Sequence, residues 1–224
     1  MTKRKKQYQH NSPSKPKFRP LTSEQADAYE LCWSNHITFL TGPAGCSKSY
    51  TAIAFAVDRL LGGCVEQVVF TRPAIEACGE NLGFLPGTAV QKVSSYMHPL
   101  FDNLNDYAGD MALVVKADLK IEPLAYMRGR TVKNSVLILD EAQNANLSQL
   151  KMLLTRIGEG SSFVICGDAD QSDIQHSKLM SVASAMSKID GIGHLHFTST
   201  SAAIRHPLIP HIIEAFDVLS CGGS

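Results

Sequence analysis

One stretch near the start of the chain constrains its fold more than any other: His36-Ile-Thr-Phe-Leu-Thr-Gly-Pro-Ala-Gly-Cys-Ser-Lys-Ser49. Its apolar residues are typical of a buried strand, and they lead into a glycine-containing turn and then a helix-forming run. Such a turn points its backbone N–H groups inward at phosphate oxygens, while a lysine and a hydroxyl at its end reach the terminal phosphates and Mg²⁺. The sequence therefore predicts a nucleotide-binding loop.

The predicted nucleotide contacts form one continuous run in which Lys48 reaches the phosphates and Ser49 ligates Mg²⁺. This run consists of Gly42, Pro43, Ala44, Gly45, Cys46, Ser47, Lys48, Ser49 and Tyr50. One position departs from the usual pattern, because a glycine is expected directly before the lysine and Ser47 stands there. A side chain at this point restricts the backbone conformations that the loop can adopt.

Apolar runs alternate with helical stretches along the chain, which predicts an α/β fold with a mainly parallel sheet flanked by helices. The expected strands are 37–41, 67–71, 135–140, 162–167 and 193–197. The expected helices are 23–34, 48–61, 88–107, 147–157, 177–188 and 207–219, the first capped by Thr22 or Ser23. The alternation breaks at 109–130, where we expect a small insertion with short antiparallel strands at 111–115 and 120–121.

The charge is uneven along a chain that is neutral overall, because seven basic residues precede the first acid, Glu24. Residues 1–20 are therefore predicted to form a disordered basic tail that favours polyanions, although a merely solubilising tail has the same composition. Residues 21–224 are predicted to form a single domain. The chain has no apolar run of transmembrane length, no secretory signal and no cysteine pair with metal-ligand spacing. These features predict a cytoplasmic protein with reduced thiols and no membrane partner.

A second apolar run, Ser135-Val-Leu-Ile-Leu, ends in two acids, Asp140 and Glu141. In an open α/β sheet, ligands bind at the carboxyl ends of the strands, so these acids should lie at the same edge as the loop. Asp140 suits Mg²⁺, which prefers oxygen ligands, and Glu141 suits the orientation or deprotonation of an attacking water. Two solvated acids at a strand end are the alternative, which the neighbouring loop disfavours.

The run 163–171 also ends in polar groups. Gln171 is predicted to sense the γ-phosphate and the attacking water, since an amide can hydrogen-bond both. Asp168 is either part of this site or a helix cap. His194 and His196 alternate on a predicted strand and can face one side, but no third ligand has suitable spacing, so we do not expect a metal there.

Eight motifs, in this order, resemble the phosphate-starvation-inducible PhoH-like family, whose P-loop ATPase core is similar to the RecA-like motor domain of superfamily 1 helicases. The resemblance covers 21–218. The motifs are Gly42-Pro-Ala-Gly with Lys48-Ser49, Phe70-Thr-Arg-Pro-Ala74, Leu82-Gly-Phe-Leu-Pro-Gly87, Pro123-Leu-Ala-Tyr-Met-Arg-Gly-Arg-Thr131, Ile138-Leu-Asp-Glu-Ala-Gln143, Leu154-Thr-Arg-Ile-Gly158, Gly167-Asp168 with Gln171, and Arg205-His-Pro-Leu208.

The resemblance implies further roles. Gln25 matches a glutamine that reads adenine, although an ordinary exposed helix residue is the alternative. Arg72 matches a motif that contacts nucleic-acid phosphate or couples it to ATP, with a structural ion pair as the alternative. Arg205 matches an arginine that approaches the γ-phosphate, but 202–203 are alanines where the family usually has an acid.

The family motifs also contain Arg128, Arg130 and Arg156, and any of them could act on the ATP site of a neighbouring subunit. Related helicases close this site between two motor domains, whereas this chain has room for one. The resemblance therefore implies a ring-shaped homo-oligomer, a hexamer, that acts on single-stranded RNA or DNA. The short length of the chain resembles that of phage-encoded members of the family, and such a protein would lie in the host cytoplasm. The sequence predicts hydrolysis of Mg²⁺-bound ATP; the alternative, which Ser47 keeps open, is an ATP-dependent assembly or binding module with little turnover.

Overall fold

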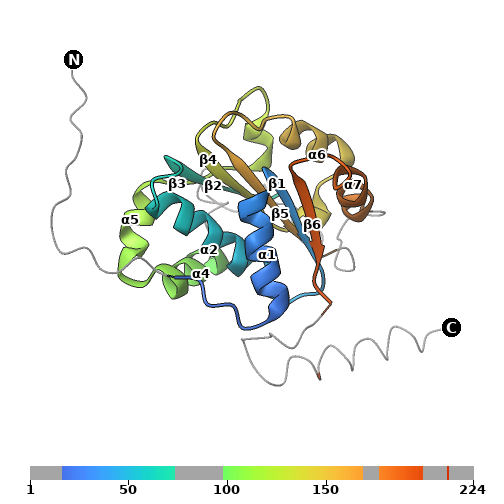
Figure 1. The fold of residues 1–224 in the computed structure, drawn as a ribbon. Helices are drawn as coiled ribbons and strands as arrows, with labels where there is room; N and C mark the ends of the chain where they lie inside the picture. Colours follow the sequence, from blue (N-terminus) through green and yellow to red (C-terminus); the bar gives the residue numbers. More distant parts are fainter. Residues whose placement is uncertain (1–16, 74–97, 169–176, 199–210, 212–224) are drawn as a thin grey trace, which may run out of the picture.

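The computed structural model describes residues 17–73, 98–168, 177–198 and 211, and it contains a six-stranded parallel sheet (Figure 1). The strands lie in the order β3-β2-β4-β5-β1-β6. Their bounds are Ile37–Thr41 for β1, Gln67–Thr71 for β2, Leu119–Ile121 for β3, Ser135–Leu139 for β4, Ser162–Gly167 for β5 and Ile192–His196 for β6.

The sheet places the strand of the predicted phosphate loop close to the strand of the two acids. β1 and β4 are separated only by β5, which pairs with both in parallel. Every residue of these three strands is buried, as expected for parallel strands covered on both faces. Thr41 is paired with Gly167 and Leu139 with Ile165, so the three strands end at one edge.

Helices cover both faces of the sheet (Figure 1). One core cluster packs α1 (Ser23–Ser34), α2 (Lys48–Leu61), α4 (His98–Ala108) and α5 (Ala112–Ala117) against one face. The other cluster packs α6 (Leu147–Leu154), α7 (Leu179–Met186) and the short 3₁₀ helices η4 (Leu124–Met127) and η5 (Ala142–Asn144) against the opposite face. In the described part of the chain, no helix combines the length and the apolar composition needed to cross a bilayer.

Five predicted elements, α1, β1, α2, β2 and β5, have the bounds expected from the sequence. Thr22 is the N-cap of α1, since its hydroxyl accepts a hydrogen bond from the backbone N–H of Gln25 at 3.2 Å. Four other elements differ at their ends: β4 stops at Leu139, β6 begins one residue early, and α6 and α7 are shorter than predicted. Of the long helix predicted at 88–107, the described residues contain α4, and most of the predicted helix 207–219 lies outside them.

The prediction of antiparallel strands after residue 109 is wrong. Gly109–Met111 is a 3₁₀ helix, η3, and residues 112–117 form α5, whose Ala112 and Val115 are buried. β3 does form a strand, but it pairs in parallel with β2 at the edge of the main sheet. The apolar residues of this run therefore form one face of a short helix. A run this short has too few residues for its pattern to distinguish a helix from a strand.

Candidate nucleotide-binding site

The loop between β1 and α2 has the backbone conformation of a phosphate-binding turn. Gly42 and Gly45 have φ values of 136° and 79°, which side chains rarely tolerate. A Cβ atom at Gly42 would also lie 2.5 Å from the carbonyl oxygen of Phe197. Glycine is thus required at Gly42 both by the turn and by the close approach of the chain that follows β6.

Ser47 adopts the left-handed conformation at φ 67° and ψ 25°, directly before the first residue of α2. This explains why the pattern favours glycine there, because an L-residue pays a steric cost in this region. The Ser47 side chain makes no capping hydrogen bond that would offset the cost. The serine therefore fits the loop, but with backbone strain.

Lys48 is turned back onto its own loop. Its ammonium donates hydrogen bonds to the carbonyl oxygens of Gly42 and Pro43, both at 2.7 Å, and lies 3.5 Å from Cys46 Sγ. Burial raises the pKa of the Cys46 thiol, so this residue stays protonated despite the lysine. The lysine is thus held over the turn, at the place where phosphate oxygens would lie.

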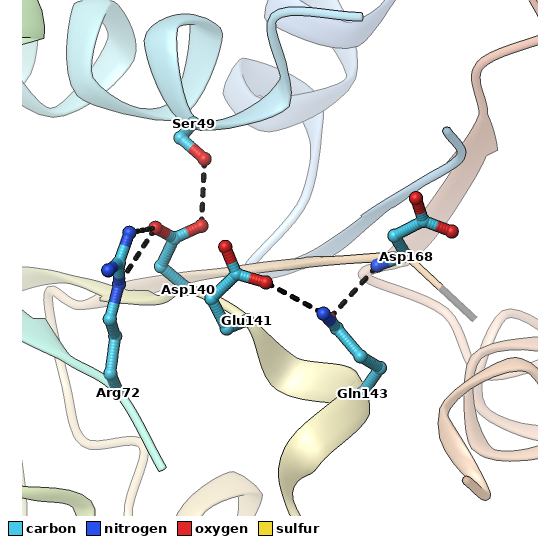
Figure 2. A network of polar contacts seen from close by, with 6 residues as sticks. All are labelled: Ser49, Arg72, Asp140, Glu141, Gln143 and Asp168. Atoms are coloured by element: carbon cyan, nitrogen blue, oxygen red, sulfur yellow. Dashed lines mark hydrogen bonds and ion pairs between the residues drawn. The ribbon is translucent and has the colours of Figure 1, made fainter. Parts of the chain in front are cut away.

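Asp140 lies just beyond β4 and is engaged on both carboxylate oxygens (Figure 2). Oδ1 accepts a hydrogen bond from Ser49 Oγ at 2.7 Å, while Oδ2 accepts from Arg72 Nη2 at 2.5 Å and Nε at 3.1 Å. A hydroxyl and a carboxylate that converge in this way are ligands that suit Mg²⁺. The ion pair with Arg72 also shows that this buried carboxylate accepts a cation. Ser49 and Asp140 therefore fit Mg²⁺. For Arg72, the ion pair that sequence analysis gave as the alternative is observed.

Glu141 lies next to Asp140 in the left-handed conformation, with a φ of 55°. Its Oε2 accepts a hydrogen bond from Gln143 Nε2 at 2.7 Å, and Gln143 Oε1 accepts from the backbone N–H of Asp168 at 3.0 Å (Figure 2). Gln143 is 1% exposed and so links the ends of β4 and β5 from within the core. We call Asp140, Glu141, Gln143 and Asp168 the carboxylate edge.

Gln143 is the residue that sequence reasoning missed, since it was part of a motif but was given no role. Gly167 reinforces its position: a Cβ there would lie 2.8 Å from Gln143 Oε1 and 2.4 Å from Leu179 Cδ2. The absence of a side chain at the end of β5 thus makes room for the amide. The signal in the sequence was a polar amide two residues beyond Glu141, but its partner 25 residues away was not predictable.

The two histidines of β6 meet at the base of the loop. Thr41 Oγ1 lies 2.8 Å from His194 Nε2 and 3.0 Å from His196 Nδ1, which confirms that both rings face one side. Burial and the neighbouring His196 lower the pKa of His194. Among the described residues, no group of three or more histidine, cysteine, aspartate or glutamate side chains is arranged to hold a metal ion.

Gln25 is buried, so its interpretation as an exposed helix residue is wrong. Its Oε1 accepts a hydrogen bond from the backbone N–H of Leu21 at 2.8 Å, whereas its Nε2 has no partner. The amide therefore retains a free donor, which is consistent with a ligand contact. Tyr50 has a different setting, since its ring packs edge-on against Tyr107 and near Phe18.

The structure describes three of the remaining predicted site residues, all of them arginines. Gln171 and Arg205 lie outside the described residues. Arg128 and Arg130 are exposed beyond β3, where Arg130 forms an ion pair with Glu122. Arg156 lies near the amino end of β4, because its carbonyl oxygen accepts a hydrogen bond from the backbone N–H of Val132, just before that strand. The predicted phosphate loop follows the carboxyl end of β1, at the other end of the strands. The roles of these arginines remain predictions.

The parallel sheet, the glycine turn with its lysine and serine, and the acids at the end of β4 define a P-loop NTPase fold of the RecA-like type. Solved structures with a similar fold support this assignment of the fold. The large terminase of a thermophilic bacteriophage matches with a TM-score of 0.53 and 10% identity over 88% of this chain and 50% of the terminase. The same terminase in complex with ADP gives a TM-score of 0.54 at 12% identity, over 87% and 50%. At these identities the match shows the fold alone.

The chain belongs to the PhoH-like protein family, whose model matches residues 17–217. A PhoH-like protein of Bacillus subtilis strain 168 is 46% identical over 89% of this chain and 64% of its own length. A PhoH-like protein of Synechocystis is 38% identical over 89% and 62%. Protein PhoH of Escherichia coli K12 is 38% identical over 70% and 46%. The chain thus spans less than two-thirds of the length of these relatives, and the family resemblance is confirmed.

Proposed function

We propose that this chain is a Mg²⁺-dependent ATPase that hydrolyses ATP to ADP and phosphate. The observation that carries the proposal is the 2.7 Å hydrogen bond between Ser49, at the start of α2, and Asp140, beyond β4. It joins the loop that would hold the phosphates to the acids that would hold the metal and the water. This arrangement suits phosphoryl transfer, in which catalysis is mostly positioning and charge stabilisation.

In this proposal, Ser49 and Asp140 would hold Mg²⁺, and the ion would supply positive charge next to the phosphate oxygens. Lys48 exchanges the carbonyl oxygens of Gly42 and Pro43 for phosphate oxygens. Glu141 orients the attacking water and takes up its proton as the water oxygen bonds to the γ-phosphorus, while the bond from that phosphorus to the oxygen bridging to the β-phosphate breaks and ADP leaves.

Gln143 supports this role of Glu141, because its hydrogen bond fixes one carboxylate oxygen and leaves the other available to the water. Gln171 is proposed to sense the γ-phosphate, Arg205 to approach it, and Gln25 with Tyr50 to contact the adenine side of the nucleotide. The free Nε2 donor of Gln25 supports its part.

We also propose that the chain acts as a ring-shaped homo-oligomer, a hexamer, in which a neighbouring Arg128, Arg130 or Arg156 completes the ATP site. The exposed positions of Arg128 and Arg130 support this, since a residue that reaches a neighbour must be accessible. Sedimentation of the full chain with and without Mg²⁺ and an ATP analogue tests it. A monomer under both conditions would contradict the ring.

The last part of the proposal is that ATP hydrolysis is coupled to the binding of single-stranded RNA or DNA. Lys17 and Arg19, the described basic residues of the N-terminal tail, are both exposed, which suits contact with phosphates. Binding of single-stranded RNA should weaken as salt rises and should weaken further without residues 1–20. A signal that is absent or insensitive to salt in both proteins would contradict the coupling.

The test of hydrolysis is the release of phosphate by the native chain and by Glu141→Gln, which keeps the shape of the side chain but cannot accept the proton. We expect turnover to fall by about 10²-fold or more. Ser47→Gly should leave it unchanged or raise it. A native rate no higher than that of Glu141→Gln would favour the second candidate, an assembly module with little turnover, which the strain at Ser47 keeps open.

A further inference from the structure

Arg72 lies one residue beyond β2, and its guanidinium is directed at Asp140 rather than into solvent (Figure 2). Two of its nitrogens, Nη2 and Nε, donate to the same oxygen, Asp140 Oδ2. The side chains of Arg72 and Asp140 are 20% and 5% exposed. The guanidinium carbon also lies 5.8 Å from the ring centroid of Phe70, which is buried, so the arginine is held from two sides.

A carboxylate as buried as that of Asp140 requires a cation or several hydrogen-bond donors, because desolvation of an unpaired charge is costly. Ser49 supplies one donor to Oδ1, and Arg72 supplies the positive charge at Oδ2. The charge of this buried carboxylate is thus balanced by a residue of the same chain. The same carboxylate is the proposed ligand of Mg²⁺.

We propose that Arg72 is a positioning residue that competes with Mg²⁺ for Asp140, so that loading of the Mg²⁺–nucleotide complex exchanges one cation for the other. This inference rests on the proposed function. Mg²⁺ requires oxygen ligands at about 2.0–2.1 Å in a near-ideal octahedron. A guanidinium that keeps both hydrogen bonds to Asp140 would crowd and repel a divalent ion there. Arg72 must therefore give up at least part of its contact when the metal is held.

The exchange has two consequences. First, Arg72 prevents Asp140 from binding a metal strongly before nucleotide arrives, while the carboxylate keeps its hydrogen bond from Ser49. Second, release of Arg72 changes the end of β2, whose backbone is joined to η4 through the hydrogen bond from Leu124 N to Arg72 O at 3.4 Å. The state of the metal site is thereby connected to the edge of the sheet beyond β2. An ion pair that is merely structural would change stability but not the dependence of nucleotide binding on Mg²⁺.

The experiment measures how much Mg²⁺ gives half-maximal binding of a fluorescent, non-hydrolysable ATP analogue to the full chain. Arg72→Gln removes the competing charge and should lower this Mg²⁺ concentration by about tenfold, as expected for loss of a charge-assisted hydrogen-bond pair. Arg72→Lys keeps the charge but not the two-nitrogen contact, so its value should lie between those of Arg72→Gln and the native chain.

The matched control is Arg59→Gln, because Arg59 stacks on Trp33 near the far end of α2, eleven residues from Lys48 and about 16 Å along the helix. Its Mg²⁺ dependence should equal that of the native chain. If Arg72→Gln fails to fold, the shift in Arg72→Lys alone decides the question. Equal Mg²⁺ dependence in all nucleotide-binding variants would overturn the inference and leave the proposed function intact, whereas a native chain that binds no nucleotide at any Mg²⁺ concentration would overturn both.

Discussion

The phosphate loop and the carboxylate edge lie side by side, but different kinds of contact hold them in place. In the loop, the contacts are local: Lys48 reaches carbonyl oxygens five and six residues before it, and the turn depends on the backbone angles of single residues. At the carboxylate edge, the contacts join distant parts of the chain. Ser49 and Asp140 are 91 residues apart, and Asp168 and Gln143 are 25 apart.

This difference determines which mutations affect each region. A local turn is altered mainly by the conformational preference of its own residues, as at Ser47. A network between strand ends depends on side chains that are buried and fully engaged, such as Gln143. Mutations at the carboxylate edge should therefore affect both folding and turnover, whereas a change at Ser47 should have a smaller effect, limited to the strain of one residue.

The largest effect is expected for Gln143→Leu, which preserves the approximate volume but removes the hydrogen bonds of the amide to Glu141 and to the backbone N–H of Asp168. The loss of these bonds in a buried site should lower the free energy of unfolding by about 1–3 kcal/mol. Turnover should also fall about tenfold or more, because Glu141 loses the hydrogen bond that fixes its carboxylate. Urea denaturation and phosphate release measure the two effects.

Gln149→Leu is the matched control for this prediction. Gln149 makes a similar hydrogen bond to a backbone N–H, that of Asn146 at the start of α6, but it lies away from the site. Its replacement should cost a fraction of the stability and leave turnover unchanged. If Gln143→Leu lowered stability but kept native turnover, the amide would support the fold and not the reaction, and the contrast between the two regions would fail.

The same contrast explains how much the sequence could predict. The loop, its lysine and its serine were predictable because each is defined by residue type and spacing within a few positions. β1, α2 and β5 also had the expected bounds, since β1 and β5 are continuous apolar runs and α2 is a long amphipathic one. The role of Gln143 and the ion pair of Arg72 depended on which strands become neighbours, which spacing along the chain does not contain. The helix α5 was misread because six residues carry too little periodicity.

An intermediate effect is expected for Ser47→Gly, which tests whether the loop is strained. Glycine adopts the left-handed conformation without steric cost, although it is more flexible in the unfolded chain. The free energy of unfolding should rise by about 0.5–1 kcal/mol. The comparison variant is Ser47→Ala, which keeps Cβ and should leave stability near native because the hydroxyl makes no capping hydrogen bond. Equal stability of the glycine and alanine variants, measured by chemical denaturation, would show that the turn is not strained.

The smallest effect concerns the base of the loop, where Thr41 contacts the two histidines of β6. Because burial lowers the pKa of His194 in the folded state, the unfolded chain binds this proton first as the pH falls below about 6.5. Its contribution to stability is thus fully present above that pH and is lost as the pH falls through the lower, folded-state value. His194→Gln should flatten the fall in unfolding free energy between about pH 7 and pH 5, whereas the exposed His36→Gln should retain the native slope. A native slope in His194→Gln would mean that protonation at the base of the loop does not oppose folding, and that the loop, like the carboxylate edge, takes its stability from other contacts.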